Sequence, residues 1–244
     1  LGYDITFINT CFENRKVSYY DHCRYRNFEG VVIVCANFND PDVIELMNSE
    51  LPVVTIDYVH HNCSAISSNN IQGIEELVKY IYSQGHRKIA YIHGQEGSTV
   101  TRDRLASFYR TMDELGLHVS DKYVRTANYL ETKGSAEQTG QLLDLPDPPT
   151  CIIYPDDTSL IGGRNVIIER GMKIPQDISV AGYDGTQISQ ILYPKLTTIK
   201  QNTELIGEEA AIRLVGAIEK PKTTLVERVV IEGILVAGKS VGRI

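Results

Sequence analysis

Hydrophobic residues recur at helical spacing in one stretch of the chain and fill a short unbroken run in the next. In the first stretch the apolar positions fall on one helical face: Ile74, Leu77, Val78 and Ile81. Gly85 follows, where a left-handed C-cap is needed. Residues 89–92 then form an apolar run closed by Gly94, which is typical of a strand buried on both faces of a parallel sheet.

A second helix is predicted after the polar turn at residues 95–98. Its apolar positions also share one side, and Gly116 ends it: Leu105, Phe108 and Met112. Helix, strand, loop and helix in this order predict a doubly wound α/β sheet. Ligands bind beyond the carboxyl ends of the strands in such sheets. We therefore expect the loop after Ile92 and the first turn of the next helix, with Arg102 and Arg104, to line a binding crevice.

The rest of the chain continues this alternation of helices and strands. Strands are predicted at residues 3–8, 31–35, 53–56, 123–127, 151–154, 178–181, 225–231 and 234–237. Helices are predicted at residues 14–27, 40–47, 133–144, 157–170 and 204–218. Asp40 as N-cap and Pro41 at the first helical position mark the start of one of them.

Composition excludes several classes of protein. The 244 residues suffice for two small domains or one large α/β domain. A net charge of −7 argues against this segment binding a phosphate backbone itself, so DNA contact must come from elsewhere. The five cysteines are odd in number and lack a Cys-x-x-Cys motif, as in reduced, cytoplasmic proteins. No apolar run approaches the roughly 18 residues of a membrane span, so no membrane partner is expected.

Three sequence blocks resemble the LacI/GalR family of bacterial transcriptional regulators. They are GHRKIAYIHG at residues 85–94 with RLASF at 104–108, PQDISVAGYD at 175–184, and LTTIKQ at 196–201. The blocks follow the family's order and spacing, and the similarity extends over nearly the whole chain. The resemblance implies two doubly wound parallel-sheet lobes of the periplasmic-binding-protein-like type I fold. Three crossings of the chain would join these lobes, near Ser68, Gln201 and Glu232.

The same resemblance predicts the extent of each lobe. The N-terminal lobe would comprise residues 1–68 and 203–231, and the C-terminal lobe residues 69–202 and 232–244. A domain of this family opens with a strand and a helix before the segment at residues 2–4, and a helix-turn-helix domain precedes them. This chain starts after all of these elements. We expect it to be a truncated form, because a sheet that lacked its central strand would leave backbone groups unpaired.

Two residues carry the expected effector site, which would lie in the cleft between the lobes. Arg104 matches the arginine of the family's Arg-x-x-x-Phe element, whose fixed donors reach ligand oxygens. The alternative for Arg104 is a solvated helix arginine paired with a nearby carboxylate. Asp184 ends a predicted strand and offers acceptors to hydroxyl or ring N–H groups. The alternative for Asp184 is an Asp-Gly turn that bonds its own backbone.

Further positions complete the expected site: Asp156, Asp57, Gln201, Ser98 and Tyr129. Asp156 stands where the family usually has asparagine, and either Asp156 or Asp157 is also able to cap the next helix. Tyr129 or Leu130 falls where many relatives place a stacking aromatic ring, and leucine in that slot would weaken stacking. These groups suit a neutral polyol, most simply a sugar, and suit a purine less well.

Motifs of other functions fail in their context. GILVAGKS at residues 233–240 matches the P-loop pattern, but its apolar centre predicts a strand and no room remains for the required helix. GKSVG at 238–242 spells a nucleophile elbow without a following helix or a downstream histidine. His60, His61 and Cys63 lack regular metal-ligand spacing. Residues 94–97 lack the third glycine of a dinucleotide fingerprint.

These observations predict the effector-binding and dimer-forming part of a LacI/GalR-like regulator, with no enzymatic activity, metal or cofactor. Its partners would be a small effector, most simply a sugar, a second copy contacted through residues 40–47, and operator DNA bound by the missing domain. An extracellular or periplasmic sugar-binding transport protein of the same fold is the alternative, since fold alone does not separate the two.

Overall fold

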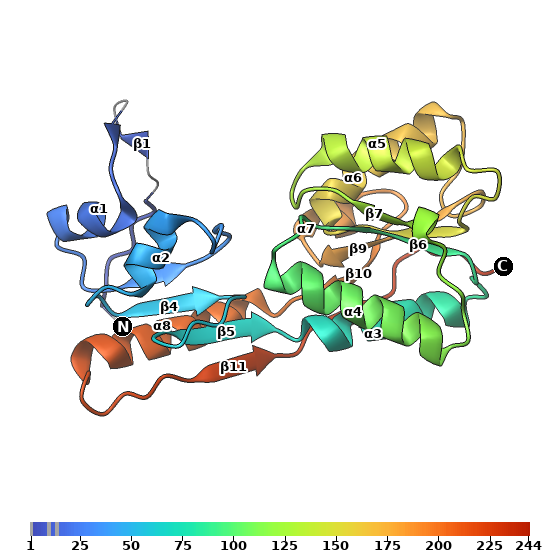
Figure 1. The fold of residues 1–244 in the computed structure, drawn as a ribbon. Coiled ribbons are helices and arrows are strands. Elements are labelled where there is room, and N and C mark those ends of the chain that lie inside the picture. Colours follow the sequence, from blue (N-terminus) through green and yellow to red (C-terminus); the bar gives the residue numbers. More distant parts are fainter. Residues whose placement is uncertain (1, 9–10, 13–14) are drawn as a thin grey trace. The chain divides into compact units, whose positions relative to one another are not determined.

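The computed structural model describes residues 2–8, 11–12 and 15–244. The chain divides into two compact units, drawn in Figure 1. Unit 1 comprises Leu1–Ser68 and Thr203–Ile231, and unit 2 comprises Asn69–Asn202 and Glu232–Ile244. Each unit combines parallel strands with flanking helices, which confirms the predicted α/β class with two parallel sheets.

The sheet of unit 1 contains four parallel strands in the order β11-β5-β4-β3. Their bounds are β3 (Val31–Ile33), β4 (Val53–Ile56), β5 (Ser64–Ser68) and β11 (Arg228–Ile231). Sequence patterns missed β5, because its sequence SAISS is dominated by serine rather than by apolar residues. Ile66 is nevertheless fully buried in it, since strands pair with β5 on both sides.

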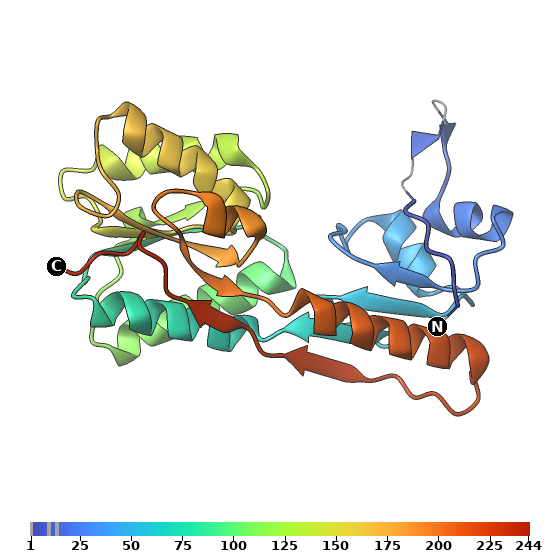
Figure 2. The ribbon, with the colours of Figure 1, turned by 180° about the vertical axis from the view of Figure 1, so that it is seen from behind.

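Helices cover both faces of this sheet, because successive strand residues point to opposite sides. They are α1 (Tyr19–Tyr25), α2 (Pro41–Met47) and α8 (Thr203–Glu219). Val53 packs into a core cluster with α1 and α2, whereas the next residue, Val54, packs with Ile206 and Ala210 of α8. Figure 2, seen from behind, shows α8 in front of this sheet. Asp40 caps α2 as predicted.

The predicted strand at residues 3–8 is wrong. Residues 2–8 contain no strand, and the side chains of Ile5 and Phe7 are 85% and 97% exposed. Their alternation resembles a strand, but a strand also needs a neighbour, and no described strand pairs with this segment. A short antiparallel pair follows, β1 (Cys11–Phe12) and β2 (Arg15–Lys16). The helix predicted at 14–27 begins only after Ser18, and residue 14 lies outside the described residues.

The sheet of unit 2 has the strand order β12-β10-β9-β8-β6-β7. Its strands are β6 (Ile89–His93), β7 (Val124–Thr126), β8 (Cys151–Ile153), β9 (Ser179–Asp184), β10 (Thr197–Lys200) and β12 (Ile234–Val236). All neighbours pair in parallel except β12, which is antiparallel to β10. The P-loop-like segment is therefore strand at its centre, as predicted, and residues 237–244 contain no helix.

Two helices pack on each face of this sheet. On one face lie α3 (Asn70–Ser83) and α4 (Thr99–Glu114), and on the other α5 (Thr132–Leu143) and α6 (Asp157–Glu169). Short helical turns, α7 (Gln187–Ile191) and Asp121–Tyr123, complete the unit. The predicted apolar stripe of α3 is fully buried: Ile74, Leu77, Val78 and Ile81. Burying such a side chain stabilises the fold by about 1.5–3 kcal/mol, so this stripe determines which face of α3 meets the sheet.

The order of strands in unit 2 reverses at β6. The chain runs from β6 to β7 on one side, and then crosses to β8 on the other side of β6. Loops that leave β6 and β8 at their carboxyl ends therefore run in opposite directions. Open α/β sheets form their ligand crevice at such a reversal.

Candidate functional site

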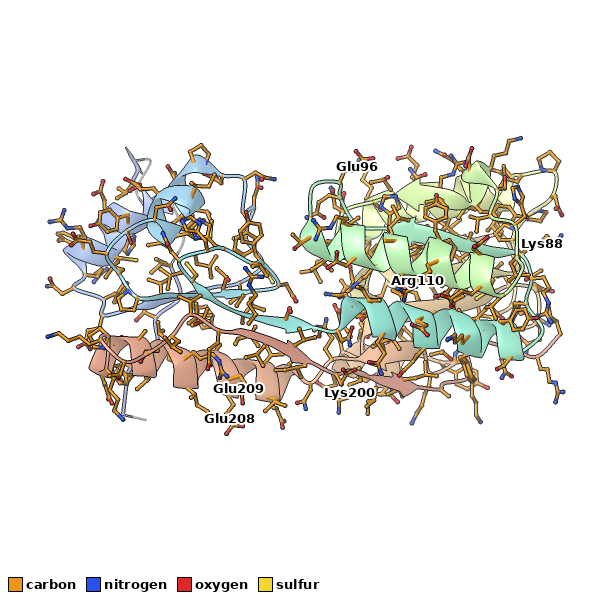
Figure 3. All side chains as sticks on the ribbon, turned by 60° about the horizontal axis from the view of Figure 1, so that its bottom comes forward. Lys88, Glu96, Arg110, Lys200, Glu208 and Glu209 are labelled. Atoms are coloured by element: carbon orange, nitrogen blue, oxygen red, sulfur yellow. The ribbon has the colours of Figure 1, made fainter. Side chains whose placement is uncertain are left out.

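Five loops of unit 2 meet at the carboxyl edge of its sheet, and each brings a polar or aromatic residue. Figure 3 marks the two ends of β6 by Lys88, just before the strand, and Glu96, in the loop after it. The residues that follow β6 to β10 at this edge are Ser98 and Arg104, Tyr129, Asp156, Asp184 and Gln201.

Arg104 is the buried centre of this edge. It lies in the second turn of α4, and its side chain is only 4% exposed. Its Nε donates to Asn70 Oδ1 at 2.7 Å, and Nη1 donates to the Pro155 carbonyl oxygen at 2.9 Å. Its Nη2 lies 3.8 Å from Asp184 Oδ1. The guanidinium is thus held in one orientation by three other elements of the unit, and the solvated-surface alternative for Arg104 does not describe it.

Aromatic rings surround the guanidinium. Its Cζ lies 3.5 Å from the ring centroid of Tyr183 and 5.8 Å from that of Tyr129. Both distances permit attraction between the cation and the ring face. Burial raises the pKa of Tyr129, while Arg104 opposes this rise. Burial also raises the pKa of Tyr91, so these phenols are neutral at physiological pH.

Gln201, directly after the neighbouring strand β10, holds Asp184 in place. Gln201 Nε2 donates to Asp184 Oδ1 at 2.5 Å, and the Gln201 backbone N–H donates to the Asp184 carbonyl oxygen at 3.1 Å. Asp184 has a φ of 95° and Gly185 a φ of 65°, so the chain turns sharply after β9. Burial raises the pKa of Asp184, with Arg104 and Gln201 acting in the opposite direction. These two neighbours thus favour the charged form of the carboxylate, against the larger effect of burial.

Tyr129 is fixed by contacts along its whole length. Its hydroxyl shares a hydrogen bond of 3.0 Å with Thr101 Oγ1, and its backbone N–H donates to Gln95 Oε1 at 3.3 Å. Its ring lies against Gly94, where an added Cβ would come within 2.1 Å of a ring carbon. Leu130 is 61% exposed, so Tyr129 and not Leu130 supplies the aromatic ring of this loop.

Asp156 and Asp157 are buried at the start of α6. Asp156 is the N-cap, with Oδ1 accepting from Ser159 N–H at 2.7 Å. Its Oδ2 accepts from Ser159 Oγ at 2.7 Å and from the Leu130 N–H at 2.9 Å. Burial raises the pKa of Asp157 to about 6. The capping role that the sequence left open between the two residues thus belongs to Asp156.

The remaining predicted residues differ in position. Ser98 caps α4, with Oγ accepting from the Thr101 N–H at 3.5 Å. Arg102 points to solvent and pairs with Asp103 at 3.1 Å. Asp57 belongs to unit 1, where it follows β4 with a φ of 60° and accepts from the Ser68 N–H at 3.2 Å. A role for Asp57 in ligand binding stays a prediction from the sequence.

Sequence patterns missed three groups that hold Arg104: Asn70, Tyr183 and the Pro155 carbonyl. Tyr183 had a usable signal, because it precedes Asp184 in a strand that ends at the crevice. Asn70 had none, since it comes from the first turn of α3, distant along the chain from Arg104. Only the packing of α3 beside α4 brings the two together.

Two hollows lie elsewhere, in unit 1. One of about 250 Å³ includes Arg213, whose charge is already paired with Glu209 and Glu227. Another of about 110 Å³ is lined by apolar side chains and Tyr19. Neither contains a predicted site residue. The convergence of polar side chains, rather than the size of a hollow, therefore defines the candidate site.

Metal chemistry finds no support in the described part of the chain, where no group of three or more His, Cys, Asp or Glu side chains is placed to hold an ion. His60 Nδ1 lies 3.8 Å from Cys63 Sγ, and burial raises the pKa of that thiol to about 11. The thiol is therefore protonated at neutral pH and a poor metal ligand. Within the described residues, no helix is long and apolar enough to cross a membrane.

Comparisons with known proteins place the chain among regulators. The family model of the periplasmic binding protein-like domain matches residues 78–241. The probable HTH-type transcriptional repressor ExuR of Bacillus subtilis is 28% identical over 207 residues, which cover 84% of this chain and 62% of that protein. The HTH-type transcriptional repressor PurR of Actinobacillus pleuropneumoniae is 29% identical over 226 residues, which cover 91% of this chain and 67% of that protein. The chain thus spans about two thirds of the length of these relatives.

Solved structures share the fold. A regulatory protein of the LacI family from Chloroflexus aggregans is 27% identical, with a TM-score of 0.78, and the match covers 92% of this chain and 80% of that one. The transcriptional regulator CelR in complex with cellobiose is 24% identical, with a TM-score of 0.81, covering 91% and 71% of the two chains. A LacI family regulator from Enterococcus faecium with bound ribose is 20% identical, with a TM-score of 0.83, covering 96% and 87%.

The fold, the crevice and the family match define a ligand-sensing domain, and the chain belongs to the periplasmic binding protein-like domain family. Within that family it is the effector-binding domain of a LacI-family regulator, as the sequence blocks predicted. LacI-family regulators are not enzymes, which agrees with the expectation from the sequence.

Proposed function

We propose that this domain binds a neutral sugar at the carboxyl edge of the unit 2 sheet, and that the sugar controls the binding of operator DNA by the full-length protein. The observation that carries the proposal is the convergence of Arg104, Asp184 and Gln201. Guanidinium donors, carboxylate acceptors and an amide together match a ring of hydroxyl groups, each of which both donates and accepts hydrogen bonds.

The charge balance of this edge favours a ligand without net charge. Arg104 already faces the partly exposed Asp184, and Asp156 adds a buried carboxylate. A ligand carboxylate or phosphate would therefore enter beside two acids and one arginine that is already paired. Ser98, at the amino end of α4, and the ring of Tyr129 complete the proposed contacts. Cellobiose and ribose, found in the two sugar-bound regulators of the same fold, are natural first probes.

The sugar would act by shifting a conformational equilibrium of the regulator. It does so only to the extent that it binds one conformation more tightly than the other. We place the regulator in the cytoplasm, where operator DNA is available, rather than outside the cell as a transport protein. The helix-turn-helix repressors among its relatives support this choice.

A second copy of the chain is the other proposed partner. The proposed contact is α2 at Pro41–Met47, whose inner face is buried by Val43, Leu46 and Met47 while Ile44 remains 42% exposed. Ile44→Glu is expected to shift light-scattering mass from dimer towards monomer while the circular dichroism spectrum stays native. A monomeric wild-type protein at micromolar concentration would contradict this part of the proposal.

A thermal-shift screen of the 244-residue domain tests whether it binds a neutral sugar. Neutral sugars, the matching sugar acids and phosphates, and purine bases are compared, because a ligand that binds only the native state raises the melting temperature. At least one neutral sugar is expected to raise it, and Asp184→Asn is expected to abolish that rise. Asp177→Asn is the matched control, since Asp177 lies in the same unit but only caps the N–H of Lys173. If purine bases alone raise the melting temperature, the ligand is a base and the proposed sugar is wrong.

A further inference from the structure

Asp156 and Asp157 stand side by side at the start of α6, yet their carboxylates reach two different loops. Asp156 Oδ2 accepts from the N–H of Leu130, the residue directly after Tyr129. Asp157 Oδ2 accepts from Thr186, two residues after Asp184, through its N–H at 2.7 Å and its Oγ1 at 3.0 Å. We propose that this aspartate pair holds the Tyr129 loop and the Asp184 turn in place, as positioning residues rather than as ligand contacts.

The two loops need such support. Leu130 has a φ of 58° and Asp184 a φ of 95°, in the left-handed region that side chains other than glycine disfavour. Such conformations persist only where surrounding contacts fix them. Asp156 and Asp157 are 1% and 0% exposed, so their hydrogen bonds are shielded from water. A buried carboxylate that accepts backbone N–H groups supplies the required fixation.

The bonding pattern explains why a carboxylate occupies position 156, where the family resemblance leads one to expect asparagine. Oδ1 accepts from the Ser159 N–H, and Oδ2 accepts from both Ser159 Oγ and the Leu130 N–H. An asparagine has one oxygen, and its NH₂ group would face an N–H donor on the other side. With asparagine, either the cap of α6 or the bond to Leu130 is lost.

Position 157 has a different requirement. Both bonds from Thr186 end on Oδ2, and Oδ1 takes no part in holding Thr186. A single amide oxygen is therefore enough to hold Thr186. The same chemical change, carboxylate to amide, is thus expected to break either the α6 cap or the Leu130 bond at position 156, and to leave the Thr186 loop held at position 157.

Amide hydrogen exchange of the 244-residue protein tests this asymmetry without a ligand, because exchange reports local opening. Asp156→Asn is expected to speed exchange about tenfold at the N–H that loses its acceptor, Leu130 or Ser159, equivalent to the loss of one hydrogen bond, and to leave Thr186 unchanged. Asp157→Asn leaves both amides protected, whereas Asp157→Ala exposes Thr186 alone. Each variant is the matched control of the other.

Asp156→Ser separates the loop from the helix cap. A serine at this position still caps α6 but is too short to reach Leu130, so it is expected to free the Leu130 amide with native helix content. This variant decides the matter if Asp156→Asn fails to fold. Unchanged protection of Leu130 in both variants, or equal effects of Asp156→Asn and Asp157→Asn on both loops, would overturn the proposal.

Ligand affinity provides a second readout. This second test rests on the proposed function, because it requires that a sugar binds at the site. If cellobiose or ribose raises the melting temperature, Asp156→Ser is expected to weaken its affinity about tenfold, because the Tyr129 ring is no longer held. An affinity equal to wild type, with a freed Leu130 amide, would show that the loop does not position a ligand contact. If no sugar binds, the proposed function fails, while the exchange data still decide whether the aspartates hold the loops.

Discussion

The guanidinium carbon of Arg104 lies 3.5 Å from the centroid of the Tyr183 ring, and Nη2 of the same side chain lies 3.8 Å from Oδ1 of the adjacent Asp184. One arginine thus stacks on one residue of β9 and pairs with the next. Two consecutive strand residues normally point to opposite faces, but the turn after β9, with its positive φ at Asp184, permits both contacts.

Removal of this arginine is expected to destabilise the domain as well as the site. Arg104→Ala removes the cation that faces Asp184 and the donor to Asn70 Oδ1 and the Pro155 carbonyl, and each buried acceptor that loses its donor costs about 1–3 kcal/mol. Urea unfolding followed by circular dichroism measures the change. Arg110→Ala is the matched control on α4, because Arg110, labelled in Figure 3, is 50% exposed in its pair with Glu75. Its expected cost is below about 1 kcal/mol. Equal costs for the two variants would contradict the buried role of Arg104.

Asp157 is expected to make stability depend on pH. Its pKa is about 6 in the folded chain and 3.8 in the absence of burial, so the folded state binds the proton more tightly. Stability from this group is therefore present below pH 4 and is lost as pH rises through about 6. The charged form costs about 3 kcal/mol at pH 7.5, from about 1.4 kcal/mol per pKa unit.

Asp157→Asn is therefore expected to be more stable than wild type at pH 7.5, with the advantage largely gone at pH 4. Urea unfolding at both pH values gives the difference. Asp144→Asn is the opposite-sign control, because a hydrogen bond from Arg170 lowers the pKa of the exposed Asp144. That variant loses stability at pH 7.5 rather than gaining it. A constant difference between Asp157→Asn and wild type across this range would rule out the burial of a charge at Asp157.

Gly94 is expected to tolerate no side chain, because an added Cβ would meet the Tyr129 ring at 2.1 Å. Gly94→Ala should push this ring away and cost about 1–3 kcal/mol, as overpacking does in other interiors. Gly207→Ala is the contrasting change, since an added Cβ in α8 meets nothing within 4 Å. It should stabilise by about 0.5–1 kcal/mol through the helix preference of alanine. Thermal unfolding of both variants tests the pair, and a Gly94→Ala protein as stable as wild type would place the Tyr129 ring elsewhere.

Leu130 is expected to be a site for stabilisation. It is 61% exposed and has a φ of 58°, a conformation that asparagine adopts more readily than leucine. Leu130→Asn should therefore raise stability by about 1 kcal/mol, or roughly 2–4 °C in melting temperature for a chain of this size. Leu225→Asn serves as control, because Leu225 is 76% exposed without a positive φ. Similar effects of both changes would mean that exposure, and not the backbone conformation, accounts for the gain.

The elements that local patterns predicted well are those of unit 2. The stripe on α3 and the apolar run of β6 depend on residue type and spacing alone, and both are fully buried in the structure. Local patterns failed where pairing with a neighbouring strand decides whether a segment forms a strand. β5 is a strand because β4 and β11 pair with it, and residues 3–8 are not, because no described strand pairs with them.

At the candidate site, too, chain order predicted the position of some residues, whereas packing determined the role of others. Chain order placed Arg104, Asp184 and Gln201 after strands whose carboxyl ends share one edge, and the structure brings these three side chains together. The sequence left open whether Asp156 faces a ligand or caps a helix. Asp156 caps α6 through Ser159 and also accepts from the Leu130 N–H, whose position the packing of a distant loop determines.

By itself the sequence determined the α/β class, most helices and strands of unit 2, and the identity of the groups available at the sheet edge, because these follow from local periodicity and residue chemistry. The tertiary structure alone decided that Arg104 is buried against Asn70 and Tyr183, and that two neighbouring aspartates hold two separate loops. The physical reason is that hydrogen bonds and ion pairs form between groups brought within about 3–4 Å, and the spacing of residues along a chain does not specify those distances.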